Sequence, residues 1–281
     1  MADMMQRVAA ELPAIARHAG DLILEIQRQG AQAETKSDGS PVTRADREAE
    51  ALIDESLAAL STGWPVIGEE ASAAGAAPRD VQGAFFLVDP LDGTREFVAG
   101  RDEFTVNIAL VVDGLPRLGA VHQPTSGRTW WSDAAGAAWR ADRNEPPQLI
   151  CVATPDTAGL RVVASRSHRH TRMDQLLALL RVRQVLHYGS SLKLVAVADG
   201  SADLYPRLTP TMAWDIAAGH AVLQAAGGDV TCWDGQPLTY HPARLRNPPF
   251  IACGAVDGSD RLAAYGLDQS FRALAGDMGS S

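Results

Sequence analysis

The chain has 281 residues and a formal net charge of −9, from 25 Lys and Arg against 34 Asp and Glu. Hydrophobic residues make up 46% and charged residues 21%, which is typical of a globular protein and argues against intrinsic disorder. The acidic balance argues against a nucleic-acid-binding protein, which needs a basic face. A small anionic substrate is compatible with this charge if metal ions supply the positive partner.

Cysteine usage and the lack of long apolar runs indicate the compartment. The cysteines, Cys151, Cys232 and Cys253, are odd in number and widely spaced, which excludes a disulfide framework and a paired-cysteine zinc site. We interpret them as buried small side chains in a reducing compartment. The chain shows no basic leader and no run of about 18 apolar residues. We predict a cytoplasmic protein without an integral membrane segment; peripheral membrane association and a homodimer both stay open.

The N-terminal half predicts two helices packed on a largely antiparallel sheet. Apolar residues at helical spacing predict a helix over residues 3–29, kinked or broken at Pro13. The polar segment 34–42 predicts a loop or an irregular hairpin, and a second helix begins at Thr43. Asp113-Gly114, between two apolar runs, is a strong hairpin signal. The predicted strands cover residues 65–67, 85–88, 104–112, 118–122, 129–132 and 137–140.

The Pro-rich stretch Asn144–Pro147 is the predicted domain boundary. It divides the chain into an α+β half, residues 1–146, and an α/β half, residues 147–281, in which strands and helices alternate. The predicted elements of the second half are strands at 161–164, 182–188, 203–205, 229–232 and 250–253, with helices from Thr171, Ser190 and about Met212.

Acidic residues follow the ends of several predicted elements. Glu69-Glu70 follows a short strand, Asp89-Pro-Leu-Asp92 follows a buried strand, and Asp215 opens a helix. Singly, each has an ordinary interpretation: a turn, a solvated surface, or an acid that complements a helix dipole. Together they supply the oxygen donors that Mg²⁺ prefers. Gly93-Thr94 then opens a segment whose backbone N–H groups could bind a phosphate.

These motifs resemble the signatures of the inositol monophosphatase superfamily, in the expected order. The motifs are Gly68-Glu-Glu70, Asp89-Pro-Leu-Asp-Gly-Thr94 and Trp214-Asp-Ile-Ala-Ala-Gly219. Further segments resemble its CysQ-type branch of 3′(2′),5′-bisphosphate nucleotidases: Asp89–Leu110, His187–Lys193 and Leu204–Arg207. Arg95 stands where that branch often has lysine. The resemblance spans Lys36 to about Gly228.

The resemblance implies a fold, a reaction and a set of metal ligands. The fold is an α/β class, layered αβαβα sandwich, and the reaction is a Mg²⁺-dependent, Li⁺-sensitive removal of the 3′-phosphate from 3′-phosphoadenosine 5′-phosphate or its 5′-phosphosulfate, as in sulfur assimilation or nucleotide recycling. Glu69, Asp89 and the carbonyl of Leu91 would hold one Mg²⁺. Asp89, bridging, with Asp92 and Asp215 would hold a second, and Glu69 could help to hold a third. Cations about 4 Å apart can clamp the attacking and leaving oxygens.

Two further residues take catalytic roles by the same resemblance. Thr94 corresponds to the hydroxyl that contacts the attacking water, and Asp46 to the carboxylate that polarises this threonine. Thr43-x-x-Asp46 also has the spacing of a capping box, in which Asp46 only caps a helix. Both roles can hold, because a carboxylate has two oxygens. With Glu69, these are the predicted catalytic residues.

The second phosphate of a bisphosphate needs positive partners outside the metal cluster. Lys193 follows Gly189-Ser190-Ser191 at a helix N-terminus, and Arg207 follows a predicted strand; a solvated surface cation is the alternative for each. The residues predicted to contact substrate are Leu91, Asp92, Gly93, Thr94, Gly189, Ser190, Ser191, Lys193, Arg207 and Asp215.

The sequence also allows other substrates, another class of protein, and other roles for some residues. Inositol monophosphate, fructose bisphosphate and histidinol phosphate are alternative substrates. A non-catalytic cation-binding regulator is the alternative of another class, but all of the metal and water positions are present. His187 and His220 favour packed, hydrogen-bonded side chains over metal ligands, and Trp130-Trp131 favours core or interface.

Overall fold

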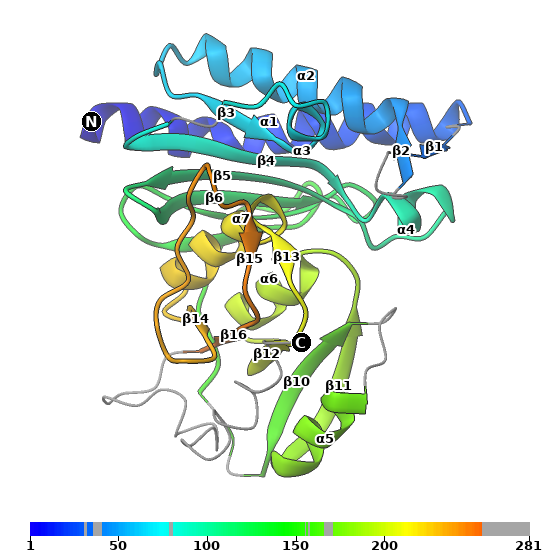
Figure 1. The fold of residues 1–281 in the computed structure, drawn as a ribbon, viewed down its shortest axis with the longest axis vertical. Coiled ribbons are helices and arrows are strands. Elements are labelled where there is room, and N and C mark those ends of the chain that lie inside the picture. Colours follow the sequence, from blue (N-terminus) through cyan, green and yellow to red (C-terminus); the bar gives the residue numbers. More distant parts are fainter. Residues whose placement is uncertain are drawn as a thin grey trace.

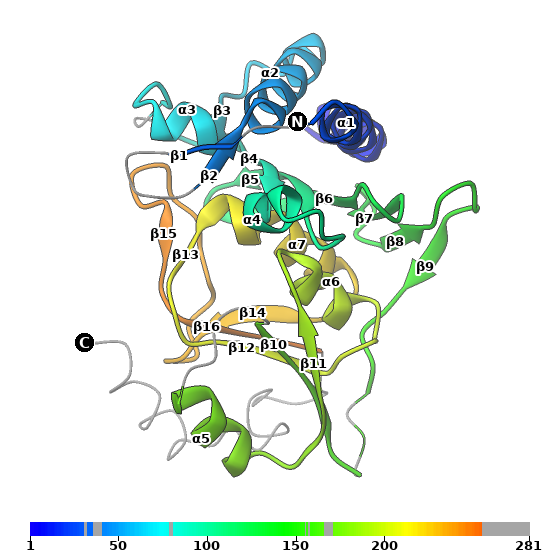
Figure 2. The same cartoon turned by 90° about the vertical axis from the view of Figure 1, so that its right-hand side faces the viewer.

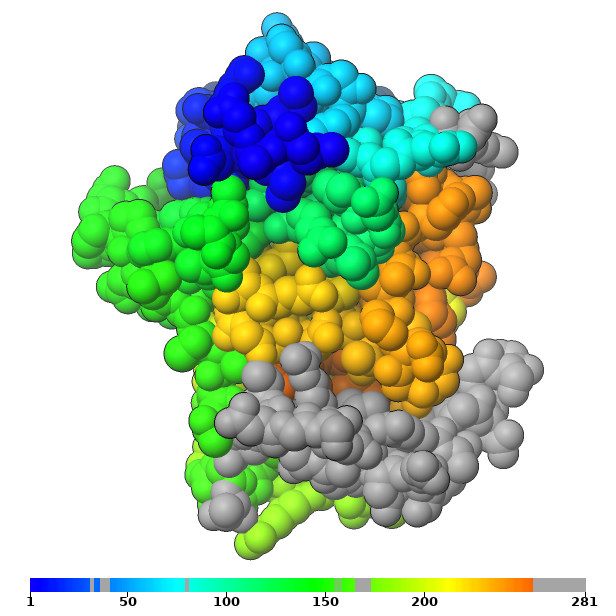
Figure 3. Space-filling model, turned by 90° about the vertical axis from the view of Figure 1, so that its left-hand side faces the viewer, coloured from blue at the N-terminus to red at the C-terminus, as the bar shows by residue number. Residues whose placement is uncertain are grey.

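The computed structural model describes residues 1–30, 33–35, 41–78, 81–154, 156, 158–165 and 171–254. Within these residues the elements form alternating layers (Figures 1 and 2): two helices, a large sheet, two more helices, a smaller sheet, and a last helix. Figure 3 shows the upper part of this order on the surface, with the blue N-terminal segment above the green one and a yellow-orange segment below them. The loop segment 36–40, which includes Lys36, lies outside the described residues.

The large sheet carries the first acidic motifs. Its order is β3-β4-β5-β6-β7-β8-β9, with neighbours antiparallel except for the parallel pair β3 and β4. At the β5–β6 turn Asp113 and Gly114 have φ of 52° and 78°, the conformation that a two-residue hairpin needs, so the predicted hairpin is confirmed. The strands are β3 (Val66–Gly68), β4 (Ala84–Asp92), β5 (Thr105–Val112), β6 (Leu115–Gln123), β7 (Arg128–Ser132), β8 (Ala138–Ala141) and β9 (Gln148–Ile150).

Helices α1 (Ala2–Arg28) and α2 (Arg44–Ala59) cover one face of this sheet (Figure 1). Their apolar stripes pack on side chains of β4 and β5 such as Phe86 and Ile108. The prediction for Pro13 is a kink or a break; the break is wrong, because α1 continues through this residue. A proline in a helix removes one hydrogen bond, and the buried face of this long helix compensates for that loss.

The opposite face of the large sheet packs on α6 (Leu192–Ala198) and α7 (Ala213–Ala225), which lie between the sheets (Figure 2). Below them the smaller sheet has the order β11-β10-β12-β16-β14. Its strands are β10 (Leu160–Ser165), β11 (Val182–Tyr188), β12 (Leu204–Arg207), β14 (Asp229–Cys232) and β16 (Phe250–Cys253). Helix α5 (Thr171–Leu179) closes the last layer through Leu176.

Short elements complete the fold. They are the hairpin β1 (Ala33–Thr35) with β2 (Pro41–Thr43), the pair β13 (Thr211–Met212) with β15 (Arg246–Asn247), and the one-turn helices α3 (Glu69–Ala73) and α4 (Thr94–Val98). In the described residues, no helix is both long and apolar enough to span a membrane.

Two further sequence expectations concern the domain boundary and the cysteines. Strand β9 lies just past residue 146 and pairs with β8 of the large sheet, while the boundary at 146/147 itself stays a prediction. The expectation that all three cysteines are buried is wrong for Cys151, which is exposed just after edge strand β9; Cys253 is buried and Cys232 is half-buried.

Candidate active site

Asp89 and Asp92 lie at the end of β4, on either side of a bulge. Asp89 pairs with Asn107 and Asp92 pairs with Thr105, so β4 has one residue more than β5 in this interval. A bulge of this kind re-aims side chains at the end of a strand. The Asp89 side chain is buried, and its Oδ1 accepts the N–H of Leu91 at 3.0 Å.

Glu69 is the first residue of α3, and a buried acid on α2 holds this short helix. Glu50 accepts the N–H of Glu70 at 2.8 Å and of Ala71 at 2.7 Å, one with each carboxylate oxygen. A Cβ atom on Gly68 would stand 2.4 Å from this carboxylate, so a larger residue there would displace the Glu50 side chain. Burial raises the pKa of Glu50 to about 7. Our sequence reasoning missed Glu50, although an acid on the buried stripe of α2, one turn after Asp46, is the signal that could have found it.

Asp215 lies in the first turn of α7, where its Oδ2 accepts the N–H of Met212 at 2.9 Å. It therefore caps its own helix with one oxygen, as an acid in the first turn often does. Its side chain also lines a pocket, described below, beside Asp92. Three separate elements, β4, α3 and α7, thus bring their acidic ends to one region.

These carboxylates raise one another's pKa. Burial, and then repulsion from Glu69, Asp92 and Asp215, raises the pKa of Asp89 well above its usual value. Burial, and then Asp92, raises the pKa of Asp215 to about 8. Burial also raises the pKa of Asp92, opposed by Lys193 and by the backbone N–H of Ser191. Bringing like charges together in a poorly solvated place is unfavourable unless a cation balances them.

The donor set fits a hard divalent cation such as Mg²⁺, since it consists of carboxylate oxygens with a backbone carbonyl nearby. Across the described ranges, however, no three His, Cys, Asp or Glu side chains form a group already arranged to hold a metal ion. The carboxylates are therefore close enough to repel one another, but they do not form a finished coordination shell.

Asp46 makes the contacts that both of its expected roles require. Its Oδ2 accepts the backbone N–H and the hydroxyl of Thr43, each at 2.7 Å, which is the capping interaction. Its Oδ1 lies 3.0 Å from the hydroxyl oxygen of Thr94. That hydroxyl also lies 3.2 Å from the carbonyl oxygen of Leu91, and its single proton serves one acceptor at a time. The capping contact and the contact with Thr94 thus use different oxygens of one carboxylate.

A cavity of about 150 Å³ opens beside the carboxylates. Leu91 and Thr94 are not among its lining residues, and the Leu91 side chain packs in the core under α1 and α2. The lining also includes Glu96, Tyr205 and Thr211, which our sequence reasoning did not single out. The predicted substrate residues that line it are Asp92, Gly93, Gly189, Ser190, Ser191, Lys193, Arg207 and Asp215.

Lys193 and Arg207 supply positive charge to this cavity. Lys193 is buried, its ammonium donates to the carbonyl of Ser190, and it lies 5.9 Å from the ring centre of Tyr205. Burial lowers the pKa of Lys193 to about 8. A solvated surface cation is therefore the wrong interpretation of Lys193. Arg207 is half-buried, and its Nε donates to the carbonyl of Thr209 at 3.0 Å.

The remaining candidates lie outside this region. His220 is buried and bonded to Tyr240 and Asp229, as expected of a packed histidine, and Trp130 lies in the core. His187 is exposed on β11.

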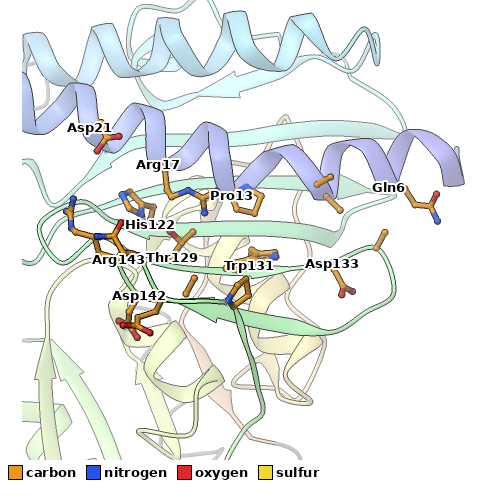
Figure 4. Close-up of a pocket in the computed structure, with 18 residues that line it drawn as sticks. Gln6, Pro13, Arg17, Asp21, His122, Thr129, Trp131, Asp133, Asp142 and Arg143 are labelled. Atoms are coloured by element: carbon orange, nitrogen blue, oxygen red, sulfur yellow. Dashed lines mark hydrogen bonds between the residues drawn. The ribbon is translucent and has the colours of Figure 1, made fainter.

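A larger cavity, of about 710 Å³, lies beside α1 and is lined by residues of α1 and of the strands β6 to β8 (Figure 4). None of the predicted site residues lines it. In the wall of this cavity, His122 Nδ1 and Thr129 Oγ1 form a hydrogen bond of 2.9 Å. Burial, with Arg17 nearby, lowers the pKa of His122 to about 4, so this ring is neutral at pH 7.

Comparison with known proteins gives this arrangement its context. The sequence model of the inositol monophosphatase family matches residues 4–255. The chain belongs to this family. The predictions of family, of the layered α/β fold and of a phosphatase are thereby confirmed.

Several members of the inositol monophosphatase family are similar over most of their length. The 3′(2′),5′-bisphosphate nucleotidase CysQ of Escherichia coli is 42% identical over 239 residues, which is 84% of this chain and 95% of the relative. The protein of the same name from Buchnera aphidicola is 36% identical over 228 residues, 80% of this chain and 84% of the relative. The crystal structure of CysQ from Bacteroides thetaiotaomicron superimposes with a TM-score of 0.74 at 32% identity, covering 90% of this chain and 98% of that one.

Proposed function

We propose that this protein is a Mg²⁺-dependent phosphatase that removes the 3′-phosphate of 3′-phosphoadenosine 5′-phosphate, and of its 5′-phosphosulfate. The products are AMP or adenosine 5′-phosphosulfate, with inorganic phosphate. Similarity to nucleotidases at 42% identity supports this substrate class. The observation that carries it is the buried Lys193, with Arg207, in the same cavity as Asp92 and Asp215.

That pairing of charges suits a substrate with two phosphates. The acidic side of the cavity needs cations before it can accept a phosphate, whereas Lys193 and Arg207 can bind a second phosphate directly. A monophosphate would leave the buried ammonium of Lys193 without an anionic partner from the substrate. The charge distribution therefore favours a bisphosphorylated nucleotide over inositol monophosphate or histidinol phosphate.

Glu69, Asp89 and the Leu91 carbonyl would hold one Mg²⁺, and Asp89, Asp92 and Asp215 a second, with Glu69 available to a third. When bound, Mg²⁺ supplies positive charge that offsets the charge of the phosphate and makes a water molecule more acidic. The raised pKa values of Asp89 and Asp215 support this assignment, because a cation stabilises the ionised carboxylates.

Thr94 and Asp46 would orient the attacking water. Because Thr43 donates to Oδ2 of Asp46, the carboxylate is fixed and its Oδ1 is directed at the Thr94 hydroxyl. With its proton donated to Asp46, the Thr94 oxygen can accept a hydrogen bond from the water and aim the water's lone pair at phosphorus. As the water oxygen bonds to phosphorus, the bond from phosphorus to the ribose 3′-oxygen breaks. One proton of the water is released, and the 3′-oxygen takes up one proton to become the ribose hydroxyl.

The test is phosphate release from a panel of substrates with and without Mg²⁺. The panel holds 3′-phosphoadenosine 5′-phosphate, inositol 1-phosphate, fructose 1,6-bisphosphate and histidinol phosphate. We expect kcat/KM to be highest for the nucleotide and activity to require Mg²⁺. A preference for any other member of the panel would show that it is the substrate instead, and no phosphate release from any of them would favour the cation-binding regulator.

We also propose that the protein acts in the cytoplasm, because the free thiols of this chain agree with a reducing compartment.

A further inference from the structure

Strand β5 has two polar side chains in a strand that is otherwise apolar. Thr105 and Asn107 are both 0% exposed. Residues on the opposite face of β5, Val106 and Ile108, pack toward α1 and α2. Thr105 and Asn107 alternate with them, and so face the helical layer between the sheets. Neither side chain belongs to the carboxylates, the Thr94 contact or the cavity lining described above.

The register of the sheet places both residues directly against the acidic motif. Thr105 is the cross-strand partner of Asp92, and Asn107 is the partner of Asp89. The bulge in β4 lies between these two pairs. The polar residues of β5 therefore stand opposite the two aspartates of the motif.

A third residue, from a distant part of the chain, closes the arrangement. Oγ of Ser191 lies 2.7 Å from Oγ1 of Thr105 and donates to Oδ1 of Asn107 at 2.6 Å. Since each hydroxyl has one proton, the bonds run from Thr105 to Ser191 to Asn107. Ser191 and Asp92 line the same cavity, and the backbone N–H of Ser191 is close enough to the Asp92 carboxylate to lower its pKa. The hydroxyl of Ser191 is thus held by β5, while its N–H faces a carboxylate of the site.

Attachment of α6 to the sheet does not by itself explain the hydrogen bonds among Thr105, Ser191 and Asn107. Nδ2 of Asn107 is buried with no hydrogen-bond partner among the described residues, which is destabilising. Well-packed apolar side chains could join the two elements without that penalty. A directional chain of hydrogen bonds, in contrast, fixes the orientation of the group at its end.

We propose that Thr105 and Asn107 are positioning residues, which act through Ser191 to hold the Asp92 carboxylate in the orientation that a divalent cation requires. The inference rests on the proposed Mg²⁺ dependence. It extends the site to residues that touch neither substrate nor metal.

The test compares Thr105→Val with Thr129→Val. Both threonines are 0% exposed on strands of the same sheet, and each has a side-chain hydrogen bond, to Ser191 or to His122. Valine keeps the shape and removes the hydroxyl, so both variants should lose similar thermal stability. Only Thr105→Val should raise the Mg²⁺ concentration for half-maximal activity, by about tenfold. It should also reduce the rise in Tm that Mg²⁺ causes without substrate.

Two further variants complete the design. Thr105→Ser keeps the hydroxyl and should restore the wild-type Mg²⁺ dependence. Asn107→Ala removes the acceptor at the other end and should weaken Mg²⁺ binding even if Thr105→Val does not fold. At saturating Mg²⁺, KM for the nucleotide should stay within about twofold of wild type for Thr105→Val, because Thr105 does not line the cavity.

Failure of the inference and failure of the proposed function give different results. If Mg²⁺ raises the Tm of the wild type and of Thr105→Val equally, or if Thr129→Val loses Mg²⁺ affinity to the same extent, the positioning role is overturned alone. If Mg²⁺ neither stabilises nor activates the wild type, the proposed metal dependence is overturned, and this inference with it.

Discussion

The hydroxyl oxygen of Thr94 lies 3.0 Å from Oδ1 of Asp46, although the two residues are 48 positions apart in the chain. Asp46 lies in the first turn of α2 and Thr94 is the first residue of α4, so two helix starts meet at one hydrogen bond. The other oxygen of Asp46 is occupied by Thr43, which fixes the carboxylate rigidly. The proposed division of one carboxylate between folding and catalysis can be tested by changing each partner separately.

Thr94→Val should lower kcat by about a hundredfold or more, as loss of a group that assists proton transfer typically does, with little change in Tm. Thr43→Ala should do the reverse. It removes the N-cap of α2 and should lower the free energy of unfolding by about 1 kcal/mol, whereas kcat should fall much less than in Thr94→Val. Steady-state kinetics and thermal unfolding of both variants measure this separation. A similar loss of stability in both would mean that Thr94 supports the fold only.

Asp89→Asn should abolish turnover while the protein stays folded. Asp89 is repelled by Glu69, Asp92 and Asp215, so removing its charge relieves repulsion in the metal-free protein. We expect Tm in EDTA to be equal to or higher than that of the wild type. Mg²⁺ should raise Tm of the wild type by mass action and leave the variant almost unchanged. Near-normal activity of Asp89→Asn would refute the bridging role.

The metal-free protein should become less stable as pH rises from about 5 to 8. Burial raises the pKa of Asp215 to about 8 and of Glu50 to about 7, from 3.8 and 4.5. An acid whose pKa is higher in the folded state binds more protons when folded. Its stabilisation is therefore complete below the unfolded pKa and is lost as pH rises through the folded value.

Thermal unfolding in EDTA across this pH range measures the effect. Addition of Mg²⁺ should restore more stability at pH 8 than at pH 5, because the cation binds the ionised carboxylates. A Tm in EDTA that is constant from pH 5 to 8 would contradict the raised pKa values.

Much of the fold could be predicted from local sequence, because its signals act over a few residues. The apolar run before Asp89 and the Asp113-Gly114 turn define β4 and the β5–β6 hairpin without any distant contact. Strand β9 was missed, because three residues at a sheet edge give no periodic pattern. The helix does not break at Pro13, because packing of its buried face on the sheet stabilises it beyond what the local sequence indicates.

The parts of the site that escaped prediction depend on long-range contacts. Ser191 and Asn107 are 84 positions apart, and nothing near either one indicates the other. Glu50 contacts the backbone of α3, 20 residues away in the chain, so its position on the buried stripe of α2 marks it as unusual without indicating which residues it contacts. Residues that carry recognisable motifs could be named in advance, whereas residues that support them became visible only in the structure.

Lys193 and Arg207 should set the preference for a bisphosphate. A charge-assisted hydrogen bond to phosphate is worth about 1.5–3 kcal/mol, or roughly ten- to a hundredfold in affinity. Lys193→Met, which keeps the buried volume, and Arg207→Ala should each raise KM for 3′-phosphoadenosine 5′-phosphate by about that factor. KM for a small monophosphate should change much less. Because the pKa of Lys193 is lowered to about 8, nucleotide KM of the wild type should also rise above that pH, and this rise should be absent in Lys193→Met. Equal losses on both substrates would show that these cations support the fold or the carboxylates rather than the second phosphate.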